Sequence, residues 1–185
     1  MEARALLDAL NVAERLKDTT RHCYTKQGRH ESVAEHSWMM TLMAFFMRDE
    51  FSEVDMDKVI RMCIIHDLGE AFTGDIPAFD KTGENEKAEE ELLYGWVRTL
   101  PANYADEMLA LYEEMAKRET VEAKVYKAID GLEAVIQHNI SDLSTWISRE
   151  YELNKTYADD KVAFSEYLKE LREEIRKDTL KKIGE

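Results

Sequence analysis

The sequence predicts an all-α domain, and three observations support this prediction. The 185 residues include only seven Gly and two Pro, so residues that favour turns are scarce. Long stretches are rich in Ala, Leu, Glu, Lys and Met, which favour helices. Apolar residues recur at intervals of three and four, as the buried side of a helix requires. A chain of this length fits a single domain over residues 1–185 and can fold without disulfides.

Three helices are expected in the first part of the chain. Residues 3–17 place leucines at near-helical spacing. A second helix, over residues 32–47, begins with a capping box, in which Ser32 caps the helix and Glu35 reaches back. A third helix begins after an aspartate cap and covers residues 55–69, where a glycine ends it.

The remaining chain continues the helical pattern after a loop that holds Gly74 and Pro77. The last expected helix is highly charged and amphipathic, so we expect it to pack on the outside of the domain as an additional C-terminal helix. The expected helices after the loop cover residues 84–99, 102–117, 120–140, 143–157 and 160–182.

Charge and cysteine content exclude several classes of partner and location. Twenty-five basic and 39 acidic residues give a net charge of −14 at pH 7, which repels the phosphate backbone of a nucleic-acid polymer. Cys23 and Cys63 make no disulfide framework and suit a reducing compartment. The N-terminus has no signal-peptide core, and the longest uncharged apolar run, residues 37–47, is far shorter than the ~20 residues of a membrane span. We therefore expect a soluble, cytoplasmic protein.

The helix expected over residues 120–140 is apolar on two sides. Ile129 belongs to one apolar stripe, and Tyr126 and Ala134 lie on the opposite side together with Asp130. A helix that is apolar on two sides is buried on two sides. A carboxylate buried there needs a cationic partner, either a Lys or Arg side chain or a metal ion.

The strongest local signal for chemistry is a pair of adjacent residues, His66 and Asp67, after a wholly apolar stretch of helix. Glu70 follows about one helical turn later, and His36 lies in the first turn of the helix that Ser32 caps. With Asp130, the chain offers two imidazoles and two carboxylates on three helices. Such a mixed set of nitrogen and oxygen donors suits a divalent transition metal ion.

Each of these groups also has a structural interpretation. His36 alone is compatible with a core histidine, His66 and Asp67 with the end of a helix, and Asp130 with an ion-paired acid. The metal interpretation is favoured because three separate helices each place an ionisable group in an apolar context.

These residues and their surroundings resemble the HD-domain metal-dependent phosphohydrolases, in particular the branch that contains the bacterial 5′-deoxynucleotidases. The four metal-binding positions are common to HD proteins, whereas the flanking strings mark this branch. The resemblance covers roughly residues 15–140, and the C-terminal helices at about 143–183 add nothing to it. It rests on Arg21-His22, on residues 31–37, on Ile65-His66-Asp67-Leu68-Gly69-Glu70, on Thr73-Gly74-Asp75-Ile76-Pro77 and on Ala128-Ile129-Asp130.

The resemblance implies that His36, His66, Asp67 and Asp130 hold one divalent ion. Ligands of this type admit Mn²⁺, Fe²⁺, Co²⁺, Ni²⁺ or Zn²⁺, so the identity of the ion stays open. Glu70 resembles the catalytic carboxylate of the family, which positions or deprotonates the attacking water.

The resemblance also implies a set of substrate contacts. Arg21 matches an arginine that binds the phosphate or the sugar edge of the nucleotide, and Asp75 matches a residue that contacts the sugar and helps to protonate the leaving 5′ oxygen. Residues 75–78, which are Asp75, Ile76, Pro77 and Ala78, would form the loop under the sugar. His22 departs from the family, where a tryptophan is thought to exclude the ribose 2′-hydroxyl, and this departure leaves the deoxy selectivity open.

The sequence therefore predicts a metal-dependent phosphohydrolase that releases phosphate from nucleoside 5′-monophosphates, with 2′-deoxynucleotides favoured by the resemblance. One alternative is an HD hydrolase of another phosphoester, such as a ribonucleotide or a nucleoside triphosphate. A second alternative is a non-catalytic nucleotide-binding module that keeps the metal as a structural staple. The family also suggests a homodimer, with the additional C-terminal helix as a candidate interface. The base preference stays open.

Overall fold

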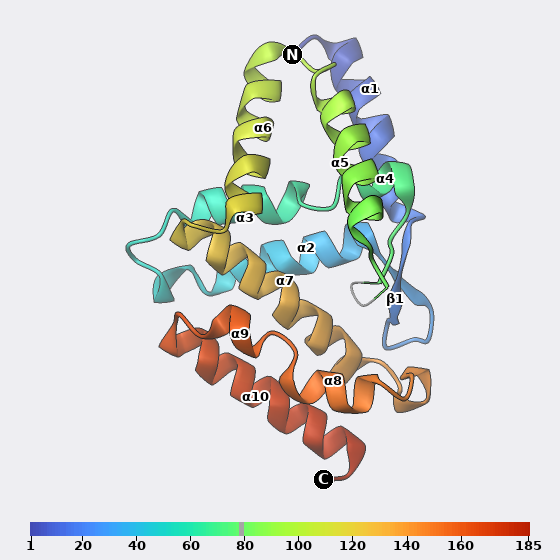
Figure 1. Ribbon diagram of the computed structural model, residues 1–185, viewed down its shortest axis with the longest axis vertical. Coiled ribbons are helices and arrows are strands. Elements are labelled where there is room, and N and C mark those ends of the chain that lie inside the picture. Colours follow the sequence, from blue (N-terminus) through green and yellow to red (C-terminus); the bar gives the residue numbers. More distant parts are fainter. Residues whose placement is uncertain (78–79) are drawn as a thin grey trace.

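The computed structural model describes residues 1–77 and 80–185. Helices dominate these residues, which confirms the all-α prediction, and a two-stranded antiparallel sheet is added to them. Figure 1 shows α2, α3 and α7 at the middle of the molecule, with α5 and α6 on one side of them and α8, α9 and α10 on the other. Among the described helices, none combines the length and the apolar character that crossing a membrane demands.

The N-terminal segment is helical as expected and then forms a hairpin that the sequence did not predict. Helix α1, Ala3–Ala13, continues as a 3₁₀ turn over Glu14–Lys17. Strand β1, Thr20–Tyr24, then pairs antiparallel with β2, His30–Ser32. The connecting turn uses Gly28 at a φ of 82°, a left-handed conformation that glycine adopts without steric cost.

The hairpin is irregular on the β1 side. Thr20 lies opposite Ser32 and Tyr24 lies opposite His30, so β1 uses more residues than β2 to cover the same length of sheet. A bulge of this kind bends the strand and redirects the side chains within it. It follows that neighbouring residues of β1 need not alternate between the two faces of the hairpin.

Three helices form the core around which the other elements pack. Helix α2, Val33–Phe46, begins at the predicted capping box, α3 covers Met56–Ile65, and α7 covers Val121–Ile140. Helix α3 is shorter than predicted because the chain turns after Ile65, and a short helix α4, Glu70–Thr73, follows the turn. Core side chains with no exposed surface come from all three long helices: Val33, Met40, Val59, Met62, Ile129 and Leu132.

Helices α5 and α6 agree with the prediction almost to the residue, at Gly83–Val97 and Ala102–Lys117. The C-terminal third is more broken than predicted. The expected helix at 143–157 is a 3₁₀ turn over Leu143–Thr145 followed by α8, Glu150–Thr156. The expected helix at 160–182 is divided into α9 and α10, whose bounds are Asp159–Val162 and Glu166–Ile183.

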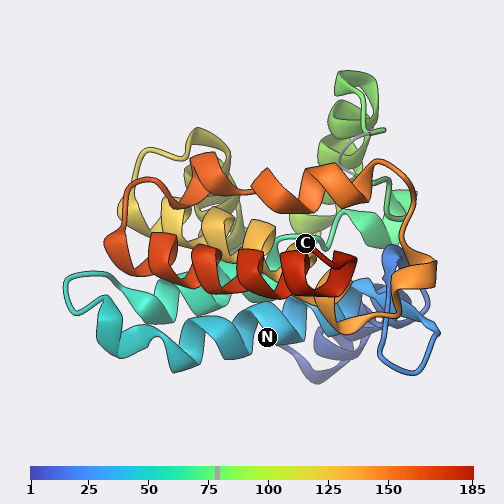
Figure 2. The same cartoon turned by 90° about the horizontal axis from the view of Figure 1, so that it is seen from below.

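Helix α10 covers α7 and is tied to α8 by a buried arginine. Figure 2, seen from below, shows α10 lying across the front of the domain. Leu168 and Ile175 of α10 belong to the buried core. Arg172, only 1% exposed, donates hydrogen bonds to the carbonyl oxygens of Tyr157 at 2.8 Å and Asn154 at 3.0 Å. The last helix therefore fixes the backbone at the end of α8.

Candidate functional site

The four predicted metal ligands come together from three places in the chain. His36 lies in the first turn of α2, His66 and Asp67 lie in the turn after α3, and Asp130 lies in the middle of α7. The His66 Nε2 atom is 2.8 Å from Asp67 Oδ2, and His36 Nε2 is 3.3 Å from Asp130 Oδ1 and 3.9 Å from Asp67 Oδ2. Donor atoms of His36, His66 and Asp67 therefore lie within 4.8 Å of one another, and Asp130 adds a carboxylate beside His36.

Both imidazoles are oriented by contacts on the far side of their rings. His36 Nδ1 lies 2.5 Å from Glu133 Oε2, and His66 Nδ1 lies 3.0 Å from the carbonyl oxygen of Cys63. Engaging Nδ1 in this way turns Nε2 toward the centre, as in known histidine metal ligands. Within residues 1–77 and 80–185, the buried His66 Nε2 finds no well-directed hydrogen bond. The set therefore fits a divalent ion.

The electrostatics of the cluster agree with this fit. Burial and the charge of Arg21 act to lower the pKa of His36, but Glu133 and Asp130 outweigh them and raise it to about 9. Burial would raise the pKa of Asp130, yet Lys127 and His36 hold it well below its usual range. Lys127 Nζ lies 2.6 Å from Asp130 Oδ2. These carboxylates thus attract positive charge, which a divalent ion would supply in exchange for a proton on His36.

Glu133 is a site residue that sequence reasoning missed. It is fully buried and accepts a hydrogen bond from Arg21 Nη1 at 3.2 Å as well as contacting His36. Glu31 Oε2 lies 3.6 Å from the same Arg21 nitrogen. Glu31, His36 and Glu133 could themselves approach one ion, but Arg21 already supplies positive charge there. The available signal was the spacing of three residues from Asp130, which places both acids on one face of a buried helix.

Two further carboxyl groups lie at the same pocket. Glu70 begins α4 and is 6% exposed, and its Oε2 atom has no hydrogen-bond partner in the part of the chain that the structure describes. Burial, followed by the charges of Asp67 and Asp75, raises the pKa of Glu70 to about 10. Burial also raises the pKa of Asp75. A dication nearby would favour the charged form of both groups, so they are placed to bind and release protons.

A cavity of about 370 Å³ joins these groups. His66 is not among the described residues that line the cavity, and its ring packs edge-on against Tyr126. Ala78 falls outside the described residues. The cavity is lined by three of the expected ligands and most of the expected substrate contacts, together with Glu70: His36, Asp67, Asp130, Arg21, His22, Asp75, Ile76 and Pro77.

The irregular strand β1 explains how Arg21 and His22, which are adjacent in sequence, both line this cavity. A regular strand would send them to opposite faces. His138, which follows Asp130 by two helical turns, lines the cavity as well, and α8 adds Asn154. The C-terminal third, to which the sequence assigned no role in the site, therefore contributes to the pocket.

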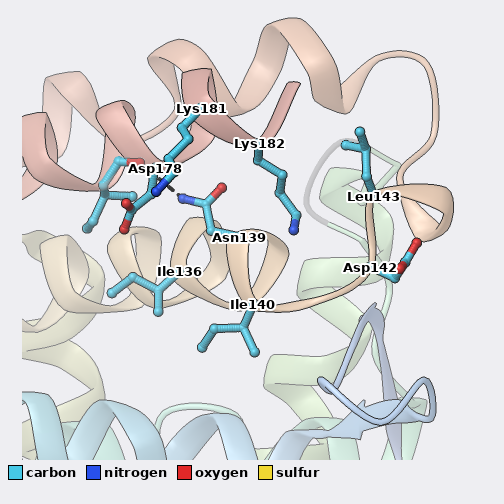
Figure 3. Close-up of a pocket in the computed structure, with 9 residues that line it drawn as sticks. Ile136, Asn139, Ile140, Asp142, Leu143, Asp178, Lys181 and Lys182 are labelled. Carbon is cyan, nitrogen blue, oxygen red and sulfur yellow. Dashed lines mark hydrogen bonds between the residues drawn. The ribbon is translucent and has the colours of Figure 1, made fainter. Parts of the chain in front are cut away.

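A second and larger cavity, of about 550 Å³, lies between α7 and α10 (Figure 3). Asn139 is held there by hydrogen bonds to the carbonyl oxygen of Ile175 at 3.0 Å and from the hydroxyl of Thr179 at 3.1 Å. Figure 3 shows the Lys181 and Lys182 side chains along its α10 side. The candidate metal-binding groups found in the described residues do not belong to this cavity.

Comparison with known proteins adds family information to this geometry. Residues 13–172 match the model of a family described as HD domain. The human 5′-deoxynucleotidase HDDC2 is 32% identical over 139 residues, which cover 73% of this chain and 67% of that protein. The 5′-deoxynucleotidase YBR242W of Saccharomyces cerevisiae is 29% identical over 144 residues, covering 71% of this chain and 58% of that protein.

Two solved structures share the fold. A predicted metal-dependent phosphohydrolase from Magnetospirillum magnetotacticum superposes with a TM-score of 0.81 at 26% identity, covering 97% of this chain and 95% of that one. A cyanophage S-2L HD phosphohydrolase, bound to dA and one catalytic Zn²⁺ ion, gives a TM-score of 0.57 at 19% identity, covering 100% of this chain and 97% of that one.

Proposed function

This chain belongs to the HD-domain family, and from that premise we propose that it is a metal-dependent phosphohydrolase that releases phosphate from nucleoside 5′-monophosphates. The observation that carries the proposal is the convergence of His36, Asp67 and Asp130 on the same cavity as Glu70 and Arg21. Relatives described as 5′-deoxynucleotidases support the substrate class.

In this proposal His36, His66, Asp67 and Asp130 hold one divalent ion, with Mn²⁺, Fe²⁺, Co²⁺, Ni²⁺ and Zn²⁺ as candidates. When bound, the ion would lower the pKa of water and neutralise charge that grows on the phosphoryl group. Glu133 orients His36 through its Nδ1 atom.

Arg21 is assigned to the phosphate. Its Nη1 atom is anchored by Glu133 at 3.2 Å, so the position of the guanidinium is set from behind. Its side chain still lines the cavity. A planar guanidinium held in this way suits the oxygens of a phosphate, which it can bind through two parallel hydrogen bonds.

Glu70 and Asp75 are assigned to proton transfer. Glu70 takes a proton from the water as the new bond from oxygen to phosphorus forms, and its buried Oε2 atom, which has no hydrogen-bond partner among the described residues, is suited to receive that proton. Asp75 gives a proton to the 5′ oxygen as its bond to phosphorus breaks. Burial raises the pKa of Asp75, which helps this carboxyl to hold the proton until it is needed.

The alternatives from the sequence differ at Glu70 and at the substrate. A metal that served only as a structural staple would need the four ligands but would not need Glu70 beside the cavity. A phosphohydrolase of triphosphates or other phosphoesters would keep the four ligands and Glu70. Only the choice of substrate separates this alternative from the proposal.

The test is phosphate release from a panel of deoxy- and ribonucleoside 5′-monophosphates, with stripped protein reloaded with Mn²⁺ or Co²⁺. We expect release that depends on the added ion and falls to background in Asp67→Ala. Release that is equal in Asp67→Ala and the unchanged protein would contradict the ligand assignment. Release from triphosphates alone would support a hydrolase of another phosphoester. Nucleotide binding without any release of phosphate would support a non-catalytic binding module.

We also propose that the chain forms a homodimer through α1 and α2. Exposed large apolar side chains gather on these helices: Leu6, Leu7, Leu10, Trp38, Phe45 and Phe46. The C-terminal helix is a weaker candidate because its Leu168 and Ile175 are buried within the domain. Light scattering on the eluting protein should give twice the chain mass, and Phe46→Glu, at a side chain 76% exposed, should shift it to the monomer mass. An unchanged mass would exclude Phe46 from the interface.

The expected cytoplasmic location remains part of the proposal. Its support is that Cys23 and Cys63 are free and buried, as suits a reducing compartment.

A further inference from the structure

Beyond the groups assigned to the reaction, the cavity contains a cluster of ionisable and polar side chains. Glu150, at the start of α8, is 1% exposed and sits between two imidazoles. Its Oε1 atom lies 2.7 Å from His22 Nε2 and 3.5 Å from His138 Nε2. Its Oε2 atom accepts a hydrogen bond from the Ile147 amide at 2.8 Å. Three separate segments, β1, α7 and α8, thus meet at one buried carboxylate.

The cluster is fixed in orientation and still reaches the cavity. The side-chain amide of Asn154 lies 3.0 Å from His138 Nδ1, so both ring nitrogens of His138 have polar neighbours. His22, His138 and Asn154 all line the cavity. The His22 side chain keeps 28% of its surface exposed. A purely structural ion pair would have no need to present its imidazoles to the cavity.

The position of the cluster matches one part of a nucleotide. His22 directly follows Arg21 and lines the same cavity, so a sugar joined to a phosphate on Arg21 would lie near His22. His138 lies eight residues after Asp130 on α7, which is about 12 Å along the helix axis. That separation leaves space for the sugar between the metal ligands and His138.

We propose that His22, Glu150 and His138 form a hydrogen-bonding site for the ribose 2′-hydroxyl, so that ribonucleoside 5′-monophosphates are substrates. This inference rests on the proposed function. Glu150 orients the two imidazoles and is a positioning residue, while His22 and His138 contact the sugar.

The physical reason is the cost of leaving polar groups without partners. A 2′-deoxyribose offers a methylene group where ribose offers a hydroxyl, and a methylene cannot satisfy an imidazole or a carboxylate. A site built to hydrogen-bond a hydroxyl therefore discriminates against an analogue that lacks it. Burial lowers the pKa of His138 against the opposite effect of Glu150, which favours a neutral ring with one donor and one acceptor nitrogen in this site.

The test compares kcat/KM for AMP and dAMP in the unchanged protein and in three variants. We expect AMP to be hydrolysed at least as efficiently as dAMP by the unchanged protein. Glu150→Gln and His22→Phe should each lower kcat/KM for AMP by about tenfold or more, and change it for dAMP by less than about threefold. Lys182→Ala, at the other cavity, should leave both values unchanged.

Binding of adenosine and 2′-deoxyadenosine to the stripped protein, followed by calorimetry, gives a second readout that needs no turnover. We expect adenosine to bind more tightly, and expect His22→Phe to remove the difference. If Glu150→Gln fails to fold in a thermal melt, His22→Phe carries both measurements.

Several outcomes would overturn the inference. A preference of more than about tenfold for dAMP in the unchanged protein would overturn it and leave the proposed function intact. Equal losses of kcat/KM for AMP and dAMP in both Glu150→Gln and His22→Phe would do the same. A ratio of kcat/KM for AMP to kcat/KM for dAMP that no variant changes would also overturn the inference. If neither nucleotide is hydrolysed, the proposed function fails, and the two nucleoside affinities then decide the inference alone.

Discussion

The two cavities of this domain lie on different sides of one helix. The larger cavity borders Ile136 and Asn139 of α7, and the smaller one borders Asp130 and His138. Lysine side chains follow the edge of the larger cavity, whereas buried carboxylates and imidazoles gather at the smaller one. The difference shows that volume alone does not identify a functional site. Buried ionisable groups that need a charged or hydrogen-bonding partner identify it better.

Changing one aspartate at each cavity gives the sharpest contrast. Asp130→Asn removes a charge that faces His36 at 3.3 Å, so we expect loss of bound metal and turnover at background. Asp178→Asn makes the same chemical change at an exposed residue of α10, beside the larger cavity. This variant should keep both its bound metal and its turnover. Metal content by mass spectrometry and phosphate release check both variants. Full metal content in Asp130→Asn would remove Asp130 from the ligand set.

Glu70→Gln should separate catalysis from metal binding inside the smaller cavity. The amide keeps the shape of the side chain but cannot take a proton from water. We expect the rate to fall by about 10²-fold or more, with metal content and melting temperature retained. Single-turnover kinetics with saturating nucleotide would measure the chemical step. An unchanged rate would show that another group receives the proton.

Glu133→Gln tests a group that contacts a proposed ligand, His36, but is not itself assigned to the ion or the substrate. Its carboxylate orients His36 and anchors Arg21, so we expect metal affinity to fall by about 10- to 100-fold. Titration of stripped protein with Mn²⁺ or Co²⁺ measures this change. Since Arg21 also loses its anchor, KM for the nucleotide should rise even at saturating metal. If neither value moves, Glu133 serves only the packing of α7.

The smallest effect is expected at the larger cavity. Lys181→Ala and Lys182→Ala change an exposed and a half-buried side chain near the C-terminal end of α10, so the free energy of unfolding should move by no more than about 0.5 kcal/mol. Phosphate release should stay within about twofold of the unchanged protein, because the site lies on the other side of α7. A larger loss of activity in either variant would connect this cavity to the reaction and weaken the contrast between the two.

Much of this arrangement could be predicted because it depends on local sequence. The capping box at Ser32 fixes the start of α2 through bonds within four residues, and the structure contains it as predicted. The periodicity of α7 indicated burial on two sides. Ile129 on one side, and Ala123 and Tyr126 on the other, are indeed buried. Helices α5 and α6 begin and end near the predicted positions for the same reason.

The parts that could not be predicted depend on contacts between distant segments. The hairpin β1–β2 is short, charged and irregular, so it lacks the alternation that indicates a strand. Glu133 reads as an ordinary charged helix residue until Arg21 and His36, about a hundred residues earlier, are placed against it. Glu150 likewise gains its meaning only from His22 and His138.

Arg172 gives the C-terminal helix an influence on the pocket that its distance would not suggest. By bonding the carbonyl oxygen of Asn154, it fixes the backbone of a residue whose side chain lies in the cavity and orients His138. The metal ligands, in contrast, are held by helices that precede α8. In the proposed sugar site, α8 and α10 therefore support side chains that contact the substrate, while the proposed metal ligands lie in earlier parts of the chain. On that proposal, changes accumulated in α10 would alter which nucleotides are accepted before they altered the capacity for hydrolysis.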